Sequence, residues 1–379
     1  MRLAFVYDRI NKFGGAERVL LALHQIWPQA PLYTAVYDQQ RASWAKVFQV
    51  IPSFIQKIPR AKKHHEIFPW LTPFAFESFD LSNFDVVISL TSAEAKGIIT
   101  QPRTMHLCYC LTPTRYLWSG FDHYLANPCF GFLNPLAKLV MKPVLKKMRS
   151  WDKVAAQRPD FYLAISKTVQ KRIKKYYQRQ SEVIYPFVDL GKFKLPVSKK
   201  KKSKKEKNYF LTVSRLVSYK RVDIVVKAFN QLKLPLKIIG DGTEKKKLQR
   251  MAKENIQFLD KHLTDKQLIS YYQNCAALVF AGEEDLGLVS LEAQACGRPV
   301  IAFRGGGMAE TVKEGETGLL FDQQTSQALI KTVSSFKAGN FSQQVCYQNA
   351  QKFTREKFIK KFKSLVEDKW KKYQNWKPR

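Results

Sequence analysis

The stretch Phe280–Thr311, FAGEEDLGLVSLEAQACGRPVIAFRGGGMAET, decides the fold of this 379-residue chain. Apolar runs of strand length end at Phe280 and Phe303, and each is followed by a glycine-containing loop and the start of a helix. Gly297 and Pro299 stand where the first of these helices should stop. The order strand, loop, helix, strand, glycine loop, helix predicts a βαβ unit of a parallel sheet, with its loops at the carboxyl ends of the strands.

Glu284 and Glu292 stand in this stretch with seven residues between them. Glu284 falls in the loop at a strand end, whereas Glu292 lies about one turn inside the helix that follows Gly287. The N–H groups at the start of that helix, near Leu288, suit a phosphate. A carboxylate one turn further on can accept hydrogen bonds from the vicinal hydroxyls of a sugar. A solvated helix face would also explain two glutamates eight positions apart.

Two other loops follow predicted strands. Gly14 and Gly15 come after the first strand of the chain and would let the backbone approach a ligand closely, although an ordinary glycine turn explains them as well. Arg215 and Lys220 follow the strand Tyr209–Val213, and two cations five positions apart can reach one diphosphate together.

These strings resemble the retaining glycosyltransferases of family 4, in a mannosyltransferase-like branch. The resemblance rests on the spaced pair Glu284 and Glu292, on FGGAERVL at 13–20, on CYCLTPTRYLW at 108–118 and on SRLVSYKRVD at 214–223. It covers essentially the full length of the chain and implies the GT-B fold, two Rossmann-like α/β domains that face each other across a cleft. Two positions depart from the pattern, because Ser92 and Leu111 stand where many relatives have His.

The resemblance implies a role for each matching position. Arg215 and Lys220 would grip the diphosphate of the donor, Glu284 would contact the transferred sugar, and Glu292 would contact the ribose. Arg215, Lys220 and Glu284 are thus the predicted catalytic residues. The remaining donor-binding positions lie in glycine loops or at a helix start: Gly14, Gly15, Gly287 and Leu288. Arg115 is the candidate acceptor-side contact, with a salt-bridged loop arginine as the alternative.

No Asp-x-Asp occurs in the sequence, so a metal ion that holds the diphosphate has no obvious carboxylate site. We therefore expect neither a metal nor a cofactor, and Arg215, Lys220 and the helix start would stabilise the departing nucleoside diphosphate. The predicted enzyme is a hexosyltransferase that uses a nucleotide-diphosphate sugar, and its acceptor is a glycan or a lipid-linked molecule. GDP-mannose is the favoured donor, and a UDP-hexose is the alternative.

The predicted domain limits follow the motifs. An acceptor-side domain covers residues 1–195, a lysine-rich linker or loop covers 196–207, and a nucleotide-sugar-binding domain covers 208–352. Residues 353–379 form a helix that, in the resembled fold, crosses back to the N-terminal domain. The linker overlaps VSKKKKSKKEKN at 197–208, a low-complexity run that suits a solvated loop and also a nucleic-acid-binding tail.

The formal net charge of +33 at pH 7 implies an anionic partner, which can be nucleotide phosphate, an anionic membrane or nucleic acid. Residues 130–156 mix apolar residues and lysines, as in a helix that lies on an anionic bilayer or in one that packs on the core with a solvated lysine face. No apolar run is long enough to span a membrane, and the first is too short for a signal peptide. We expect a cytoplasmic protein at the inner face of the membrane.

Two rival functions stay open on the sequence alone. The first is a basic nucleic-acid-binding α/β protein, for which the charge speaks, although the chain has no zinc-finger spacing and no aromatic signature of the RRM type. The second is a protein that binds a nucleotide sugar without turnover, which Ser92 and Leu111 make conceivable. We expect no specific nucleic-acid partner.

Overall fold

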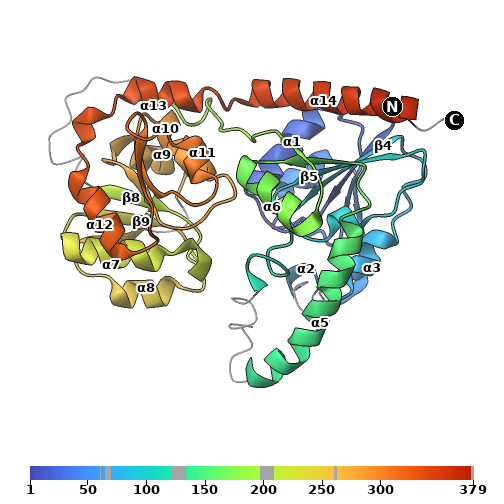
Figure 1. Ribbon diagram of the computed structural model, residues 1–379, viewed down its shortest axis with the longest axis horizontal. Helices are drawn as coiled ribbons and strands as arrows, with labels where there is room; N and C mark the ends of the chain where they lie inside the picture. Colours follow the sequence, from blue (N-terminus) through green and yellow to red (C-terminus); the bar gives the residue numbers. More distant parts are fainter. Residues whose placement is uncertain (60, 65–69, 122–133, 197–208, 260–262, 377–379) are drawn as a thin grey trace. The chain divides into compact units, whose positions relative to one another are not determined.

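The computed structural model describes the chain except for residues 60, 65–69, 122–133, 197–208, 260–262 and 377–379 (Figure 1). The chain forms two compact units. The first unit contains Met1–Ile184 and Ile359–Arg379, and the second contains Tyr185–Phe358.

The first unit is built on a parallel sheet with the strand order β3-β2-β1-β4-β5-β6-β7. Its strands are β1 Leu3–Tyr7, β2 Leu32–Thr34, β3 Val50–Pro52, β4 Val86–Thr91, β5 Met105–Cys110, β6 Phe161–Ala164 and β7 Glu182–Val183. Its helices are α1 Gly15–Ile26, α2 Ala61–His64, α3 Thr72–Glu77, α5 Asn134–Ala155 and α6 Lys167–Tyr177, with the short 3₁₀ helices η1 Ser43–Val47, η2 Phe54–Lys57 and η4 Ala95–Gly97.

The second unit is built on another parallel sheet, with the strand order β10-β9-β8-β11-β12-β13. Its strands are β8 Phe210–Val213, β9 Leu236–Ile239, β10 Ile256–Leu259, β11 Leu278–Phe280, β12 Val300–Phe303 and β13 Gly318–Phe321. Its helices are α7 Val222–Leu232, α8 Lys245–Met251, α9 Asp265–Asn274, α10 Leu288–Ala295, α11 Met308–Thr311, α12 Ser326–Ser335 and α13 Gln343–Ala350, with the 3₁₀ helices η7 Ser218–Lys220 and η8 Ala338–Asn340.

Strand β11 explains why this sheet reads as an unbroken apolar run in the sequence. Leu278 and Phe280 belong to one buried cluster, and Val279 between them belongs to another. Successive side chains of a strand point to opposite faces, so a sheet with helices on both faces buries every residue of its central strands. The predicted fold class, two Rossmann-like units with parallel sheets, is confirmed.

By its contacts, the first unit ends at Ile184, and the predicted domain limit at residue 195 stays a prediction. Strand β7 is short, and the chain after it packs into the second unit. There the ring of Phe187 lies against Phe358, and Phe193 lies edge-on to Tyr272. The linker assigned to 196–207 lies outside the described residues except for Pro196.

The last helix, α14 Arg355–Trp376, begins in residues of the second unit and gives its residues from Ile359 on to the first. There the ring of Phe362 packs against the rings of Trp27 and Tyr109. The Tyr373 hydroxyl donates to the carbonyl of Pro102 at 2.7 Å. The C-terminal part of the helix is therefore an integral piece of the first unit.

Helix α5 decides between the two interpretations of residues 130–156, as far as its side chains are described, which is from residue 142 on. Leu145 and Met148 are buried and form a cluster with Leu117. Lys142, Lys146 and Lys147 are exposed. Leu145 and Met148 of this part are thus used for core packing, whereas its lysines are open to solvent. Residues 130–133 lie outside the described residues. No helix in the described ranges is long and apolar enough to cross a membrane.

Candidate functional site

The order of strands in the second unit marks one place for a ligand. The chain builds β8, β9 and β10 outward in one direction, then returns to place β11 on the other side of β8. The crevice at the carboxyl ends of two such strands, where the order reverses, is where open α/β sheets bind ligands. The loop after β8 carries Arg215 and Lys220, and the loop after β11 carries Glu284. The structure therefore brings these predicted residues to the same point of one sheet.

Lys220 and Glu284 form an ion pair across this point, with Lys220 Nζ bonded to Glu284 Oε1. The lysine side chain is 9% exposed and the carboxylate 17% exposed. Lys220 also lies over the rings of Tyr219 and Phe280, at 5.1 and 5.8 Å from their centroids. A cation held this way is fixed in position, and a phosphate of higher charge can replace its carboxylate partner.

Arg215 lies at the same loop but is exposed. Its guanidinium donates to the Tyr219 hydroxyl and lies 5.9 Å from the centroid of that ring. Tyr219 thus contacts both residues that are predicted to bind the diphosphate, Arg215 and Lys220. The sequence reasoning did not single out Tyr219, although an aromatic residue between two cations in SRLVSYKRVD was a usable signal.

The loop after β11 leads into α10 through Gly287, which is the N-cap with a φ of +86°. L side chains rarely adopt this conformation, and a Cβ here would also lie 2.6 Å from the sulfur of Met308. Leu288 is the first residue of α10, as predicted from the sequence. The backbone conformation of Gly287 thus fixes where α10 starts.

Glu292 lies one turn further into α10 and is 7% exposed. Its Oε2 accepts a hydrogen bond of 2.9 Å from the hydroxyl of Tyr272, which projects from α9 and is fully buried. Burial, together with the nearby Glu292 carboxylate, raises the pKa of Tyr272 well above its usual value, so this hydroxyl stays a donor. Nothing in the sequence near Glu292 points to Tyr272, which stands twenty positions earlier.

The triple glycine after β12 supports the acidic loop. The N–H of Gly307 donates to the carbonyl of Glu284 at 2.7 Å. Gly306 has a φ of +72°, and a Cβ at this residue would lie 2.2 Å from the same carbonyl oxygen. Only glycine allows two backbones to approach this closely. The function of this glycine run is therefore to hold the backbone that carries Glu284.

The first unit has the same kind of reversal, between β1 and β4. Asp8, directly after β1, is 4% exposed and accepts from the Thr91 hydroxyl and the Ser92 N–H, both at 2.7 Å. Gly14 and Gly15 lie at the start of α1 in this unit, whereas Lys220, Glu284 and Glu292 lie in the second. Gly14 has an extended backbone with a φ of −167°, which any residue can adopt.

Arg115 is half-buried in the loop after β5. A buried network centred on Asp152 of α5 fixes this loop, because its carboxylate accepts from Thr114 at 2.8 Å and from Trp118 at 2.7 Å. Lys96 pairs with the same carboxylate, and both side chains are buried. The neighbouring Tyr116 hydroxyl donates to Glu94. The position of the Arg115 backbone is thus well defined, and its role as an acceptor contact stays a prediction.

His106 is the nearest imidazole in sequence to Ser92 and Leu111. It is fully buried in β5, and its Nε2 lies 2.8 Å from the hydroxyl of Ser89. Burial lowers its pKa to about 3, so it is neutral at physiological pH. This histidine is a packed strand residue.

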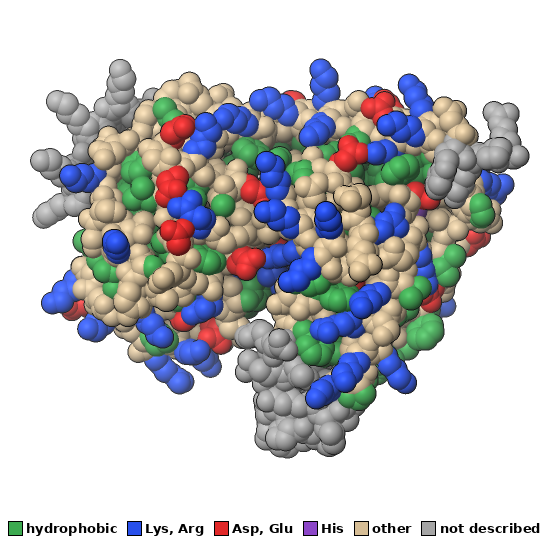
Figure 2. Space-filling model, in the orientation of Figure 1, with side chains coloured by type: hydrophobic (Ala, Val, Ile, Leu, Met, Phe, Trp, Pro, Cys, Tyr) green, Lys and Arg blue, Asp and Glu red, His purple; other side chains and the backbone are tan. Residues whose placement is uncertain are grey.

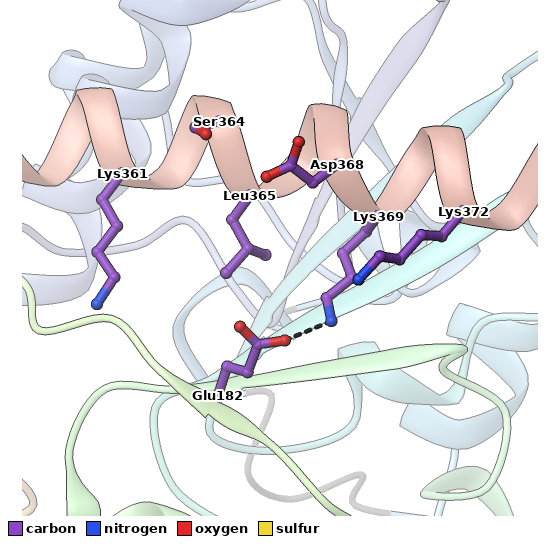
Figure 3. A pocket seen from close by; sticks show the side chains of 7 residues that line it. All are labelled: Glu182, Lys361, Ser364, Leu365, Asp368, Lys369 and Lys372. Carbon is purple, nitrogen blue, oxygen red and sulfur yellow. Dashed lines mark ion pairs between the residues drawn. The ribbon is translucent and has the colours of Figure 1, made fainter.

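The first unit has a surface pocket that is lined by side chains of α14 and of Glu182 (Figure 3). The α14 residues are Lys361, Ser364, Leu365, Asp368, Lys369 and Lys372. The pocket lies between α14 and the edge strand β7. Lys369 pairs with Glu182, and Lys361 donates to the carbonyl of Val183 at 3.1 Å. Lysines over an edge strand prevent pairing with another chain, so the pocket is explained by protection of the sheet edge. In the parts of the chain described, no group of three or more His, Cys, Asp or Glu side chains could hold a metal ion.

Comparison with known proteins finds a family similarity within the second unit. Residues 195–353 match the family model of the glycosyl transferases group 1. This segment is therefore similar to group 1 glycosyltransferase domains. The match includes β8, β11 and α10, and therefore Arg215, Lys220, Glu284 and Glu292.

Relatives of the chain carry glycosyltransferase names. An uncharacterized glycosyltransferase of Methanocaldococcus jannaschii is 26% identical over 223 residues, which is 58% of this chain and 61% of the relative. A GDP-mannose-dependent alpha-(1-6)-phosphatidylinositol monomannoside mannosyltransferase of Mycolicibacterium smegmatis is 34% identical over 146 residues, 33% of this chain and 37% of the relative. The chain thus spans less than two thirds of the length of these relatives.

A solved structure extends the likeness beyond the group 1 domain. The crystal structure of HepE from Anabaena in complex with UDP aligns with 97% of this chain and 100% of its own, with a TM-score of 0.66 and 17% identity. At this identity the likeness shows the fold alone. It agrees with the predicted GT-B class of two Rossmann-like domains.

Proposed function

We propose that the protein is a retaining glycosyltransferase that transfers a hexose from a nucleotide-diphosphate sugar to a glycan or lipid-linked acceptor. The observation that carries the proposal is the Lys220–Glu284 pair at the strand-order reversal of a group 1 domain, with Arg215 beside it. An exchangeable cation, a second cation and a helix start are the groups that a sugar diphosphate needs.

Each group has a distinct task in this proposal. As the bond from the anomeric carbon to the diphosphate breaks, negative charge collects on the leaving diphosphate. Arg215 and Lys220 stabilise that charge, because both are already in place before the reaction. Glu284, released from Lys220, contacts the hexose. Glu292, held by Tyr272 through one carboxylate oxygen, accepts hydrogen bonds from the ribose with the other.

The mechanism differs from that of a two-carboxylate hydrolase. In retaining hydrolases the two carboxyl groups flank one bond at about 5 Å from each other. Here Lys220 holds Glu284, and Tyr272 of a different helix holds Glu292. The two carboxylates thus have different partners. In this proposal they serve different parts of the donor, and no covalent glycosyl intermediate forms.

GDP-mannose is our preferred donor, and the name of the Mycolicibacterium relative supports it. A UDP-hexose is the alternative, for which the UDP complex of the HepE structure speaks. Arg115 is proposed as an acceptor contact, and the acceptor is proposed to be presented at an anionic membrane. The nucleic-acid alternative rests on the net charge of +33, and its lysine run at 197–208 lies outside the described residues.

A panel of GDP-, UDP- and ADP-sugars in a thermal-shift assay tests the proposal. A ligand at about 100 times its Kd adds about 2.7 kcal/mol of stability, which shifts the melting temperature measurably. We expect stabilisation by one nucleotide family, and release of free nucleoside diphosphate when a mixed acceptor extract is added. Stabilisation without release indicates a protein that binds the donor without turnover. No shift with any nucleotide sugar, in a folded protein, refutes the assignment.

A further inference from the structure

The two units differ in how many large hydrophobic side chains they expose at the surface. Within the described ranges, all eight large hydrophobic residues that are strongly exposed belong to the first unit. Four of them fall within residues 47–74: Val47, Phe54, Trp70 and Phe74 are 54%, 43%, 49% and 61% exposed. Exposed apolar groups scattered singly need no explanation, but a concentration in one short segment indicates an interaction surface.

Local packing explains why these rings face outward. η2 and α3 pack against each other through a cluster that contains Ile55 and Ala75. Phe54 and Phe74 directly precede these two buried residues in the chain, so they stand on the outer sides of two neighbouring elements. The rings have no place in the core that the elements share.

Basic residues accompany these rings. Lys57 and Lys62, on η2 and α2, are exposed. Over residues 39–76 the sequence has six lysines and arginines but a single acidic residue. Helix α5 adds its open lysine face, and it lies beside α3 (Figure 1), where Trp151 Nε1 donates to Glu77 Oε1 at 2.7 Å. Figure 2 shows Lys and Arg side chains spread over the visible face, with hydrophobic side chains among them.

We propose that this aromatic–lysine surface, defined by Phe54, Lys57, Lys62, Trp70 and Phe74, binds an anionic lipid bilayer. Aromatic rings settle at the boundary of headgroups and acyl chains, and lysines beside them meet anionic headgroups. Insertion of α5 into the bilayer is not the favoured alternative, because Leu145 and Met148 in the described part of that helix are buried in a cluster with Leu117.

Vesicle sedimentation with the full-length, nuclease-treated protein tests this inference, and it needs no donor substrate. The vesicles contain phosphatidylcholine alone or phosphatidylcholine with about one third phosphatidylglycerol. We expect binding only to the anionic vesicles and a decrease with added salt. The double variant Phe54→Ala/Phe74→Ala should lower the partition coefficient by about tenfold or more, since each ring loses its burial in lipid.

Matched variants separate the surface from the overall charge. Lys57→Glu/Lys62→Glu and Lys331→Glu/Lys337→Glu change the net charge equally, and the second pair is exposed on the other unit. Only the first pair should lose vesicle binding. Ile99→Ser, which alters a residue 53% exposed in the same unit, should leave it unchanged. If the double phenylalanine variant does not fold, the lysine pairs still decide the question.

Three results overturn the inference. If the wild type and both surface variants bind anionic vesicles equally, the aromatic–lysine surface does not bind the bilayer. If the surface variants lose single-stranded RNA binding while their vesicle binding is unaffected, the surface is assigned to nucleic acid. A dimer of the wild type that dissociates in the surface variants, without vesicle binding, assigns it to a second copy of the chain. Nucleotide-sugar binding is measured on the same samples, so a failure of the proposed function is recognised separately.

Discussion

The two points of strand-order reversal share one architecture and carry opposite chemistry. In the second unit the facing side chains are Lys220 and Glu284, which form an ion pair. In the first unit Asp8 is held by the Thr91 hydroxyl and by the N–H groups of Ser92 and Ala95. A carboxylate bound by a hydroxyl and by backbone N–H groups in this way joins two loops of the first unit. The comparison teaches that the same strand-order reversal can hold an ion pair or a hydrogen-bonded carboxylate, and in our proposal the ion pair makes the second crevice a phosphate site.

The largest expected effect is on turnover at the exchangeable pair. Lys220→Ala and Arg215→Ala should each lower kcat by about 10²–10³, as does the removal of one preorganised donor to developing charge. Donor affinity should fall less, because the charge grows as the bond breaks. Steady-state kinetics and calorimetry with the nucleoside diphosphate measure the two terms.

Lys331→Ala is the control, since it removes one exposed lysine from α12 of the same unit and should leave both terms unchanged. Equal losses of binding and turnover would reduce Arg215 and Lys220 to ground-state anchors. Full activity of both variants would remove the site from this loop.

The next effect concerns Glu292 and the residue that holds it. Glu292→Ala should weaken donor binding by about 1.5–3 kcal/mol, the value of a hydrogen bond to a charged group. Tyr272→Phe keeps the buried ring but removes the hydroxyl that orients the carboxylate, so we expect a smaller loss. Calorimetry with the nucleoside diphosphate and with its 2′-deoxy and 3′-deoxy analogues separates positioning from general damage.

If Tyr272 positions Glu292, the variant Tyr272→Phe should bind the ribonucleotide more weakly and the deoxy analogue that lacks the contacted hydroxyl as before. The preference for ribose would then shrink. A purely structural role of Tyr272 lowers the affinity for all three nucleotides equally.

The sequence was sufficient to predict the strands and loops of the second unit, but it was not sufficient to predict the side-chain contacts inside its site. Because both faces of the sheet are covered, strands such as β11 are unbroken apolar runs, and their loops could be placed at one edge. The ion pair joins residues 64 positions apart, and the Tyr272–Glu292 bond joins helices that only the fold brings together. Local patterns carry no information on such partners.

The first unit shows a second limit. The lysines and apolar residues of α5 fit a membrane-bound helix and a packed helix equally, because periodicity reports which face is apolar and not what covers it. The structure places Leu117 against Leu145 and Met148, which decides the question for that part of the helix. The exposed rings of Phe54 and Phe74 could not be told from core residues by their residue type.

A smaller effect is expected where the first unit uses a carboxylate for structure. Asp8→Asn keeps the shape but weakens the bonds to Thr91, Ser92 and Ala95, because an amide is a poorer acceptor than a carboxylate and one of its positions now donates. We expect a loss of about 1–3 kcal/mol in the free energy of unfolding. Chemical denaturation measures it. The affinity for the nucleoside diphosphate should be unchanged, and a loss of affinity without a loss of stability would contradict the comparison.

The smallest effect is predicted for metal removal, and it tests whether the exchangeable lysine is sufficient for the diphosphate. If Arg215 and Lys220 carry the charge of the leaving group, chelation with EDTA should leave kcat and the donor KM unchanged, because no divalent ion then takes part in the transition state. The measurement compares activity after dialysis against EDTA with activity after addition of excess magnesium or manganese. A metal-dependent glycosyltransferase, assayed beside it in the same buffers, shows that chelation was complete. Loss of activity that magnesium or manganese restores would show that the cations of the β8 loop need a metal beside them. Because Lys220→Ala would then be partly compensated by a higher metal concentration, the same variant assayed over a metal titration distinguishes a shared role from an independent one.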